Sequence, residues 1–446
     1  MLIGLAALGV GAAAAAYYAA AGLTLTHYDA RAHLVVARRI IDSLTPGWQQ
    51  VGAVWLPLPH LLNMFPVQID AMYRSGASAV AISVLSAAIT AWALSAVILR
   101  TTASTSGAAA AAALVVLNPN VLYLQSTPMT EPLLFAAATG SIALTAAWID
   151  RGARGWPTSA GLALTAACLT RYEGWPITAA VIATAAAVLL RRGETVRVVA
   201  GQCARLAAYP AIAIGLFLIN SWWTVGAWFV SGGFFVPENT EALGHPLVAW
   251  AQVRDGLYRL SGTGLVWSAY AGMLVVVTAF ARSRIRAPLL LVIALAAAAA
   301  LPCSAYVRGH PFRIRYDLPL VVACGALAGA GIGALWPRVR PIAALAVVTV
   351  ALAQAHPLDR AAPLITESQR DAANLTGRRV VTSYLVQHRD GRTIMMSMGS
   401  LGHYMQDLSA DGFDIRDFLH EGNGDLWSFA MSKPLGVVGW IAIEER

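Results

Sequence analysis

The chain has 446 residues, of which 58% are hydrophobic and only 12% are charged. Soluble domains carry about 25% charged residues, so this composition excludes an ordinary cytosolic enzyme and indicates a membrane protein. The formal net charge is +8, but the arginines are scattered at the ends of apolar runs and form no basic, aromatic surface, which excludes a nucleic-acid partner.

Eleven apolar runs are predicted to cross the membrane as helices. A bilayer core of about 30 Å requires about 20 helical residues, and the runs that approach this length are 2–24, 77–99, 107–125, 132–149, 157–170, 175–190, 205–221, 263–281, 287–305, 317–335 and 341–355. The first run lacks the basic residues that open a signal peptide, so we interpret it as a membrane helix. The run at 157–170 is short, which leaves a re-entrant hairpin around Arg171 as an alternative to two spans.

The charges of the connecting loops predict the orientation. The loops 100–106, 150–156, 191–204, 282–286 and 336–340 are short and rich in arginine. Short arginine-rich loops stay in the cytoplasm, so the other loops are predicted to lie on the outer face of the cytoplasmic membrane. That outer face holds nearly all the acidic residues of the membrane half.

Two outer loops, 25–76 and 222–262, are long, and long loops often carry function. In the first, Arg31, Arg38 and Asp42 follow one polar stripe, which predicts a helix lying at the membrane interface. The second loop is rich in aromatic residues: Trp222, Trp223, Trp228, Phe229, Phe234 and Phe235. These residues are typical of an aromatic belt or of the wall of a lipid-facing cleft.

Residues 356–446 are far more polar, which predicts a small soluble α/β domain after a membrane domain of residues 1–355. Strands are expected at 379–385, 393–399 and 437–445, and a helix at 401–408. The turn around 397–404 fits either an anion-binding turn or a purely structural one. The cysteines, Cys168, Cys203, Cys303 and Cys324, all lie in or beside apolar runs, which indicates buried thiols and neither a disulfide frame nor a zinc site.

Acids and arginines from five separate outer segments are expected to meet at one face. These segments are 27–33 (HYDARAH), 54–60 (VWLPLPH), 118–132 (ending in MTEP), 171–176 (RYEGWP) and 310–319 (HPFRIRYDLP). Each has a simpler interpretation by itself, because Asp29 suits a helix cap or a pair with Arg31, and Arg171 suits a local salt bridge with Glu173. Their common location favours a functional site.

The order of these segments resembles that in the GT-C superfamily of polyprenyl-phosphate-sugar-dependent glycosyltransferases. Within this superfamily, it is most similar to the branch of protein O-mannosyltransferases and aminoarabinose transferases. The resemblance covers about residues 1–355. It rests on the acid after the first span, the interfacial helices in the first outer loop and the second long loop. Three sequence stretches add to it: Pro-x-Pro-His, Thr-Pro-Met-Thr-Glu-Pro-Leu and the Arg-Tyr-x-x-Pro entry to a late span. It implies an inverting transfer of a sugar from a polyprenyl phosphate to an acceptor hydroxyl of a protein, lipid or glycan.

The resemblance also implies roles for particular residues. Asp29 matches the catalytic base and Glu131 a second acid, while His60 and His245 match positions that contact donor or acceptor, as we also expect of Glu173 and Tyr316. Planar, always-charged guanidinium groups suit the binding of a departing phosphate. Arg313 and Arg315 are the first candidates for this role, and Arg171 is the second. A divalent metal remains possible, and no other cofactor is implied.

Two other classes of function remain open. A lipid or solute transporter places charges in the middle of broken helices and has repeated halves, and the sequence shows neither feature. A non-catalytic factor that binds a glycolipid would use the same outer loops without turnover.

Overall fold

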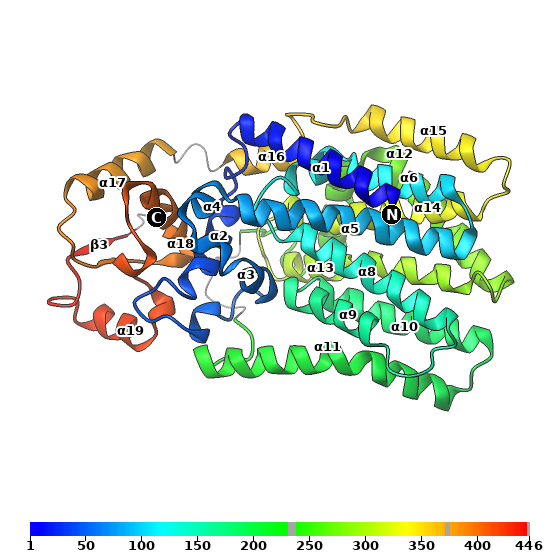
Figure 1. Ribbon diagram of the computed structural model, residues 1–446, viewed down its shortest axis with the longest axis horizontal. Helices are drawn as coiled ribbons and strands as arrows, with labels where there is room; N and C mark the ends of the chain where they lie inside the picture. The colour runs from blue at the N-terminus through cyan, green and yellow to red at the C-terminus, as the bar shows by residue number, and fades with distance from the viewer. Residues whose placement is uncertain (231–237, 371–374, 444–446) are drawn as a thin grey trace.

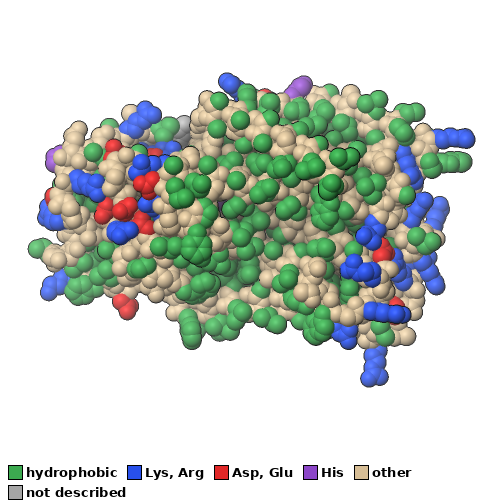
Figure 2. Space-filling view, viewed as in Figure 1, with side chains coloured by type: hydrophobic (Ala, Val, Ile, Leu, Met, Phe, Trp, Pro, Cys, Tyr) green, Lys and Arg blue, Asp and Glu red, His purple; other side chains and the backbone are tan. Residues whose placement is uncertain are grey.

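A computed structural model describes residues 1–230, 238–370 and 375–443. It has two parts, a long helical bundle and a small C-terminal domain at one end of that bundle (Figure 1). Short helices of the first long loop lie where the two parts meet. Side chains coloured as hydrophobic cover most of the bundle's visible side, and arginines gather at the end far from the C-terminal domain (Figure 2).

The bundle consists of long apolar helices, as predicted. Among the described residues, 8 helical segments are long and apolar enough to cross a membrane, and three shorter apolar helices accompany them. The bundle helices are α1 (Leu2–Ala20), α5 (Ala77–Thr102), α6 (Thr105–Val116), α8 (Glu131–Asp150), α9 (Thr158–Thr170), α10 (Gly174–Arg192), α11 (Val196–Val225), α12 (Pro246–Arg282), the 3₁₀ helix η3 (Ala287–Ala299) continuing into α13 (Ala300–Val307), η4 (Ile314–Asp317) continuing into α14 (Leu318–Ala334), and α15 (Arg340–Gln354).

Helix α10 is long and apolar enough to cross a membrane, whereas α9 is a shorter apolar helix of 13 residues. Arg171, between them, contacts Glu131 at the first residue of α8. Arg192, at the end of α10, contacts Asp150 at the last residue of α8, with 2.5 Å between Nη2 and Oδ1. Helix α10 therefore extends along the full length of α8, from one end of the bundle to the other, which favours a span over a re-entrant segment for α10.

Two predicted segments differ from the structure. The expected span 107–125 is divided at Asn118, whose side chain caps the short helix α7 (Pro119–Leu124) by accepting from the N–H groups of Asn120 and Val121. The expected loop 222–262 contains helical structure, because α11 extends to Val225 and a helix begins at Pro246. The segment called α12 is two helices that meet at a kink at Gly262 (φ 75°), so the apolar span itself begins at 263, as predicted. Phe234 and Phe235 lie outside the described residues.

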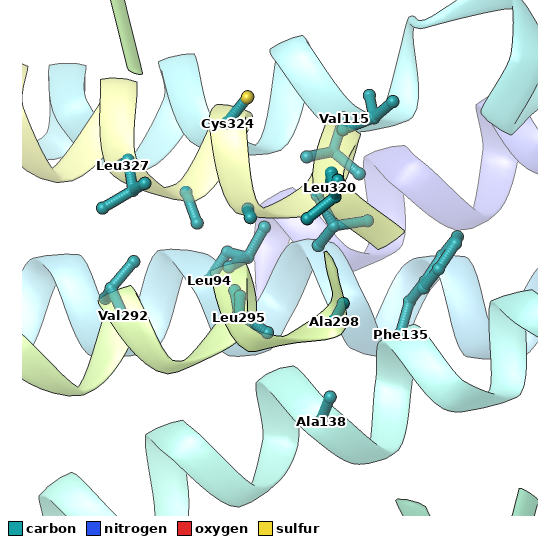
Figure 3. Packing of buried hydrophobic residues seen from close by; sticks show 14 of the residues in the cluster. Leu94, Val115, Phe135, Ala138, Val292, Leu295, Ala298, Leu320, Cys324 and Leu327 are labelled. Atoms are coloured by element: carbon teal, nitrogen blue, oxygen red, sulfur yellow. The ribbon is translucent and has the colours of Figure 1, made fainter. Parts of the chain in front are cut away.

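Close helix packing holds the centre of the bundle together. A Cβ added to Gly107 of α6 would lie 2.6 Å from the carbonyl oxygen of Gly329 in α14, and one added to Gly331 would lie 2.5 Å from the Cα of Gly272 in α12. Small residues let helix backbones approach this closely in a membrane. Residues of α5, α6, α8, η3 and α14, Cys324 among them, fill the surrounding core (Figure 3). All four cysteines are free thiols.

The rim of the bundle carries short helices: α2 (Tyr28–Arg39), η1 (Trp48–Val51), α3 (Leu58–Asn63), η2 (Pro66–Gln68), α4 (Asp70–Ser75), α7 and α16 (Pro363–Ser368). The predicted interfacial helix in the first loop is therefore present as α2. Leu34 and Val35 of α2 belong to one buried cluster with Met396 and Leu401 of the C-terminal domain. This apolar contact fixes α2, and with it Asp29, against that domain.

The C-terminal domain contains α17 (Leu375–Gln387), β1 (Ile394–Met396), α18 (Met398–Leu408), η6 (Ser409–Asp411), η7 (Ile415–Asp417), β2 (Phe418–Leu419), η8 (Glu421–Asn423), α19 (Asp425–Ser432) and β3 (Trp440–Ala442). The three strands form a parallel sheet in the order β2-β1-β3, with Ile394 beside both Phe418 and Trp440. The α/β class is as predicted.

Within this domain, individual predictions had mixed outcomes. The strand expected at 379–385 is wrong, because these residues are helical in α17, where Arg378 contacts Asp407 at 2.7 Å. The helix expected at 401–408 begins earlier, at Met398. The strand expected at 437–445 is shorter among the described residues, since β3 covers Trp440–Ala442.

Candidate active site

Asp29 lies in the first turn of α2 at the rim of the bundle. His27 caps that helix, since its Nδ1 accepts a hydrogen bond of 3.2 Å from the backbone N–H of Asp29. The Asp29 side chain is therefore not the cap, and it forms an ion pair with Arg315. Arg31, the other suggested partner, donates instead to the carbonyl of Leu25 and to Asp407.

The electrostatic surroundings keep the Asp29 carboxyl ionised. Burial by itself raises the pKa of this carboxyl, but the Arg315 guanidinium, followed by His27 and His33, lowers the pKa overall below its ordinary value. Asp29 is 15% exposed and Arg315 10% exposed, so water or a ligand reaches the pair only over a small area. A carboxylate held in this way is available as a proton acceptor.

Arg315 has hydrogen-bonding capacity that the described residues do not use. It lies in η4, and its Nε and Nη1 are buried without a hydrogen-bond partner in the described part of the chain. Buried N–H donors without a partner are rare in native proteins. The guanidinium carbon lies 5.2 Å from the centre of the Tyr316 ring, which places Tyr316 at the same site.

Arg313 precedes η4 and is exposed. It forms no ion pair with a described residue, and its charge acts on the nearby His27 and His310. Arg313 and Arg315 thus place an exposed and a buried guanidinium two residues apart, next to Asp29.

Arg171 is surrounded by two acids from neighbouring segments. Its Nη1 lies 3.0 Å from Glu131 Oε1 and its Nη2 lies 2.8 Å from Glu173 Oε1, and both carboxylates are buried. Burial lowers the pKa of Arg171, but Glu131 and Glu173 together raise it overall. Because two carboxylates already satisfy this guanidinium, it suits a structural link between α8 and α10 better than Arg315 does.

The two candidate histidines have different surroundings. His60 is buried in α3 and its Nε2 lies 3.0 Å from Nδ1 of His33, one helical turn after Asp29. Burial, followed by the charge of Arg39, lowers the pKa of His60 to about 3, so this imidazole is neutral at ordinary pH. His245 caps the start of α12, is exposed, and has no side-chain contact with the other candidate residues in the described parts of the chain.

Two buried acids beside this site were not among the predicted site residues. Asp317 is 0% exposed, and its carboxylate has no hydrogen-bond partner among residues 1–230, 238–370 and 375–443. Glu367 of α16 accepts a hydrogen bond of 2.9 Å from the backbone N–H of Ile314, between the two arginines. Burial raises the pKa of Glu367, partly offset by Arg315. Asp317 was visible in the sequence beside Arg315, whereas Glu367 follows the last span and gave no such signal.

The turn at 397–404 holds a carboxylate of the protein itself. Glu421 accepts hydrogen bonds from the backbone N–H groups of Met398, at 2.8 Å, and Gly399, at 2.7 Å, at the start of α18. A helix N-terminus favours such a negative charge. Of the two interpretations of this turn, the structural one therefore applies.

Across the described residues, no three His, Cys, Asp or Glu side chains are grouped in a way that holds a metal ion. Asp29 and Glu131 are instead each paired with an arginine.

The chain is a polytopic helical bundle with short helices in its first loop and a small α/β domain beside the rim, and this fold is shared by a membrane enzyme of known structure. The structure is similar to the crystal structure of ArnT from Cupriavidus metallidurans bound to undecaprenyl phosphate, with a TM-score of 0.55 and 14% sequence identity over 97% of this chain and 88% of that chain. The fold expected from the resemblance is thus confirmed. No family model and no curated protein matches the sequence.

Proposed function

We propose that this chain is an inverting membrane glycosyltransferase, which transfers a sugar from a polyprenyl phosphate to an acceptor hydroxyl. The observation that carries this proposal is the ion pair between Asp29 and Arg315, with two unused donors on Arg315 and the exposed guanidinium of Arg313 beside it. The likeness to ArnT, solved with undecaprenyl phosphate, supports this class of donor.

The arginines act on the phosphate that leaves. Arg315 Nε and Nη1 donate to phosphate oxygens, and Arg313 adds a second positive charge from the accessible side. Fixed positive charges stabilise the negative charge that develops on the leaving group, and one such interaction is worth roughly 3–4 kcal/mol in other enzymes. The phosphate therefore departs without being protonated.

Asp29 acts on the acceptor. The acceptor hydroxyl attacks the anomeric carbon from the side opposite the phosphate and gives its proton to the Asp29 carboxylate. The electron pair of the broken sugar–oxygen bond remains on the phosphate. Because the attack comes from the opposite face, the configuration at the anomeric carbon inverts. As Arg315 shares its charge with a bound phosphate, the pKa of Asp29 rises toward its ordinary value, and the carboxylate becomes a stronger base when the donor is present.

The remaining assignments follow from this arrangement. Arginine-rich loops at the other end of the bundle favour a site on the periplasmic or extracellular face of the cytoplasmic membrane. The C-terminal domain lies at the same end of the bundle as Asp29, and it packs against α2, the helix that carries Asp29. We assign this domain a part in recognising the acceptor, which is a protein, lipid or glycan. We assign Glu131 the role of a second acid, and His60, Glu173, Tyr316 and His245 the role of contacts of donor or acceptor.

The test is the substitution Asp29→Asn in protein reconstituted with labelled polyprenyl-phosphate sugars and a membrane extract that supplies acceptors. Loss of the base should lower transfer by about 10²- to 10⁴-fold, while native mass spectrometry should show unchanged or tighter donor binding. Asp150→Asn is the matched control, because Asp150 pairs with Arg192 at the other end of the bundle. Transfer at the wild-type rate by Asp29→Asn, or movement of the lipid without any glycosylated product, would contradict the proposal.

A further inference from the structure

A separate hollow lies at the arginine-rich end of the bundle, away from Asp29. Its volume is about 390 Å³, and it is formed by the loop between α8 and α9 and the first turns of α11. The lining residues are Ala153, Arg154, Gly155, Arg197, Val198, Gly201, Gln202 and Arg205. Ligand pockets usually measure about 300–1,000 Å³, so the hollow is large enough for a lipid headgroup.

The lining contains three guanidinium groups and no acid. Arg154, Arg197 and Arg205 are exposed, and none of them forms an ion pair or a side-chain hydrogen bond with a described residue. Nearby Arg192, in contrast, pairs with Asp150. Three like charges around one concavity repel one another, and a bound phosphate would relieve that repulsion through charge-assisted hydrogen bonds.

The backbone adds to this preference for an anion. Helix α11 begins at Val196 and has 30 residues, and its N-cap, Thr195, makes no side-chain capping hydrogen bond. The N–H groups of the first turn of a helix point toward the space before it, where they favour negative charge. Gln202, which is 8% exposed, also lines the hollow, and its Nε2 donates to the carbonyl oxygen of Ala153 at 3.3 Å, which ties the α8–α9 loop to α11.

Apolar side chains around the hollow distinguish a lipid from a free phosphate ion. Val198 lines it and is 44% exposed, and Trp156, next to the lining residue Gly155, is 65% exposed. Further along α11, Ile212 and Leu216 are each 63% exposed. An exposed tryptophan at the end of a membrane helix is typical of the membrane interface, and an apolar stripe that begins at a phosphate-sized basic hollow suits an acyl chain.

We propose that this hollow binds the phosphate headgroup of an anionic phospholipid from the adjoining leaflet, with an acyl chain lying along α11. The site is independent of the proposed transferase site, because it lies at the opposite end of the bundle and shares no residue with it. The bound lipid holds the α8–α9 loop and the start of α11 together by contacting both.

The test compares two triple variants of the full chain in detergent. Arg154→Gln, Arg197→Gln and Arg205→Gln remove the charges of the hollow, whereas Arg282→Gln, Arg284→Gln and Arg338→Gln remove the same charge from other loops at this end. Phosphatidylglycerol is titrated and counted by native mass spectrometry. Because a basic residue near an anionic headgroup contributes about 1 kcal/mol, the first variant should bind it at least about tenfold more weakly, and the second should bind as wild type does.

Equal weakening in both variants would show general charge attraction and overturn the proposal, and so would unchanged binding in the first. If inorganic phosphate displaces the lipid, or phosphatidylcholine binds equally well, the anionic-lipid assignment is wrong. Should the first triple variant fail to fold, the single change Arg197→Gln serves instead, with a loss of about fivefold expected and wild-type binding again contradicting the site.

Discussion

Asp29 and Arg315 lie far apart in the sequence, yet after burial each is the largest influence on the pKa of the other. Arg315 lowers the pKa of Asp29, and Asp29 is the one acid with which Arg315 forms an ion pair in the described parts of the chain. Their meeting was predictable from the sequence, because both follow or precede an apolar span on the same face. The exact partner was not, since Arg31 and Arg171 lay equally close in the predicted topology.

The variant Arg315→Gln tests this coupling through pH. Without the guanidinium, burial raises the pKa of Asp29, so the carboxyl becomes protonated at a higher pH. The transfer rate of the variant should therefore decline on the acid side, whereas the wild-type rate should stay level from about pH 5 to 8. Initial transfer rates between pH 4 and 8 provide the measurement. Arg313→Gln is the control: it should weaken donor binding as well, but its pH profile should keep the wild-type shape. Identical profiles for the two variants would refute the coupling.

Among the elements, hydropathy predicted the bundle helices well and the rim poorly. A long apolar run has few alternatives to a membrane helix. Residues 246–261, with Gln252, Arg254 and Asp255, form instead a polar helix that meets the apolar span at the Gly262 kink, and hydropathy does not reveal such a helix. The β-branched residues near Val380 favoured a strand. The segment is instead the helix α17, whose Arg378 pairs with Asp407 of α18. In α17, therefore, tertiary contacts outweighed local propensity.

Glycine contacts between elements lead to a stability prediction. A Cβ on Gly272 of α12 would overlap the backbone carbonyl of Leu327 in α14, and a backbone atom cannot rotate away. Gly272→Ala should therefore destabilise the protein by about 1–3 kcal/mol. Gly140→Ala, in the equally buried α8 with nothing within 4 Å of the added atom, should leave stability unchanged or raise it by about 0.5–1 kcal/mol. Thermal unfolding in detergent measures both, and equal midpoints would contradict the packing argument.

For the molecule as a whole, buried histidines in and beside the C-terminal domain predict sensitivity to acid. Burial lowers the pKa of His420 to about 3 and that of His60 to about 3, with a smaller effect of Arg39 on each. Unfolded histidine binds a proton below about pH 6.5, while the folded state does not until about pH 3. Stability should therefore fall as the pH drops below 6.5, by up to about 1.4 kcal/mol per pH unit for each histidine.

The variant His420→Asn isolates one of these contributions. Asparagine keeps an acceptor for the N–H of Gly422, which His420 Nδ1 now satisfies at 3.1 Å, but it removes the titrating group. The melting temperature of the variant should decline less between pH 6.5 and 4.5 than that of wild type. His356→Asn, at an exposed position after α15, should decline as wild type does. An unchanged acid response in His420→Asn would contradict the assignment.

Glu367 has a consequence for biogenesis. It binds the backbone between Arg313 and Arg315, yet it belongs to α16, which is synthesised after the last apolar helix of the bundle. The ribosome therefore completes the bundle helices from α1 to α15 before the residue that holds this arginine segment emerges. A nascent chain interrupted at that stage already contains Asp29 and both arginines but lacks this constraint, so an assembling protein acquires its ordered rim last, when the tail folds back onto the inserted bundle.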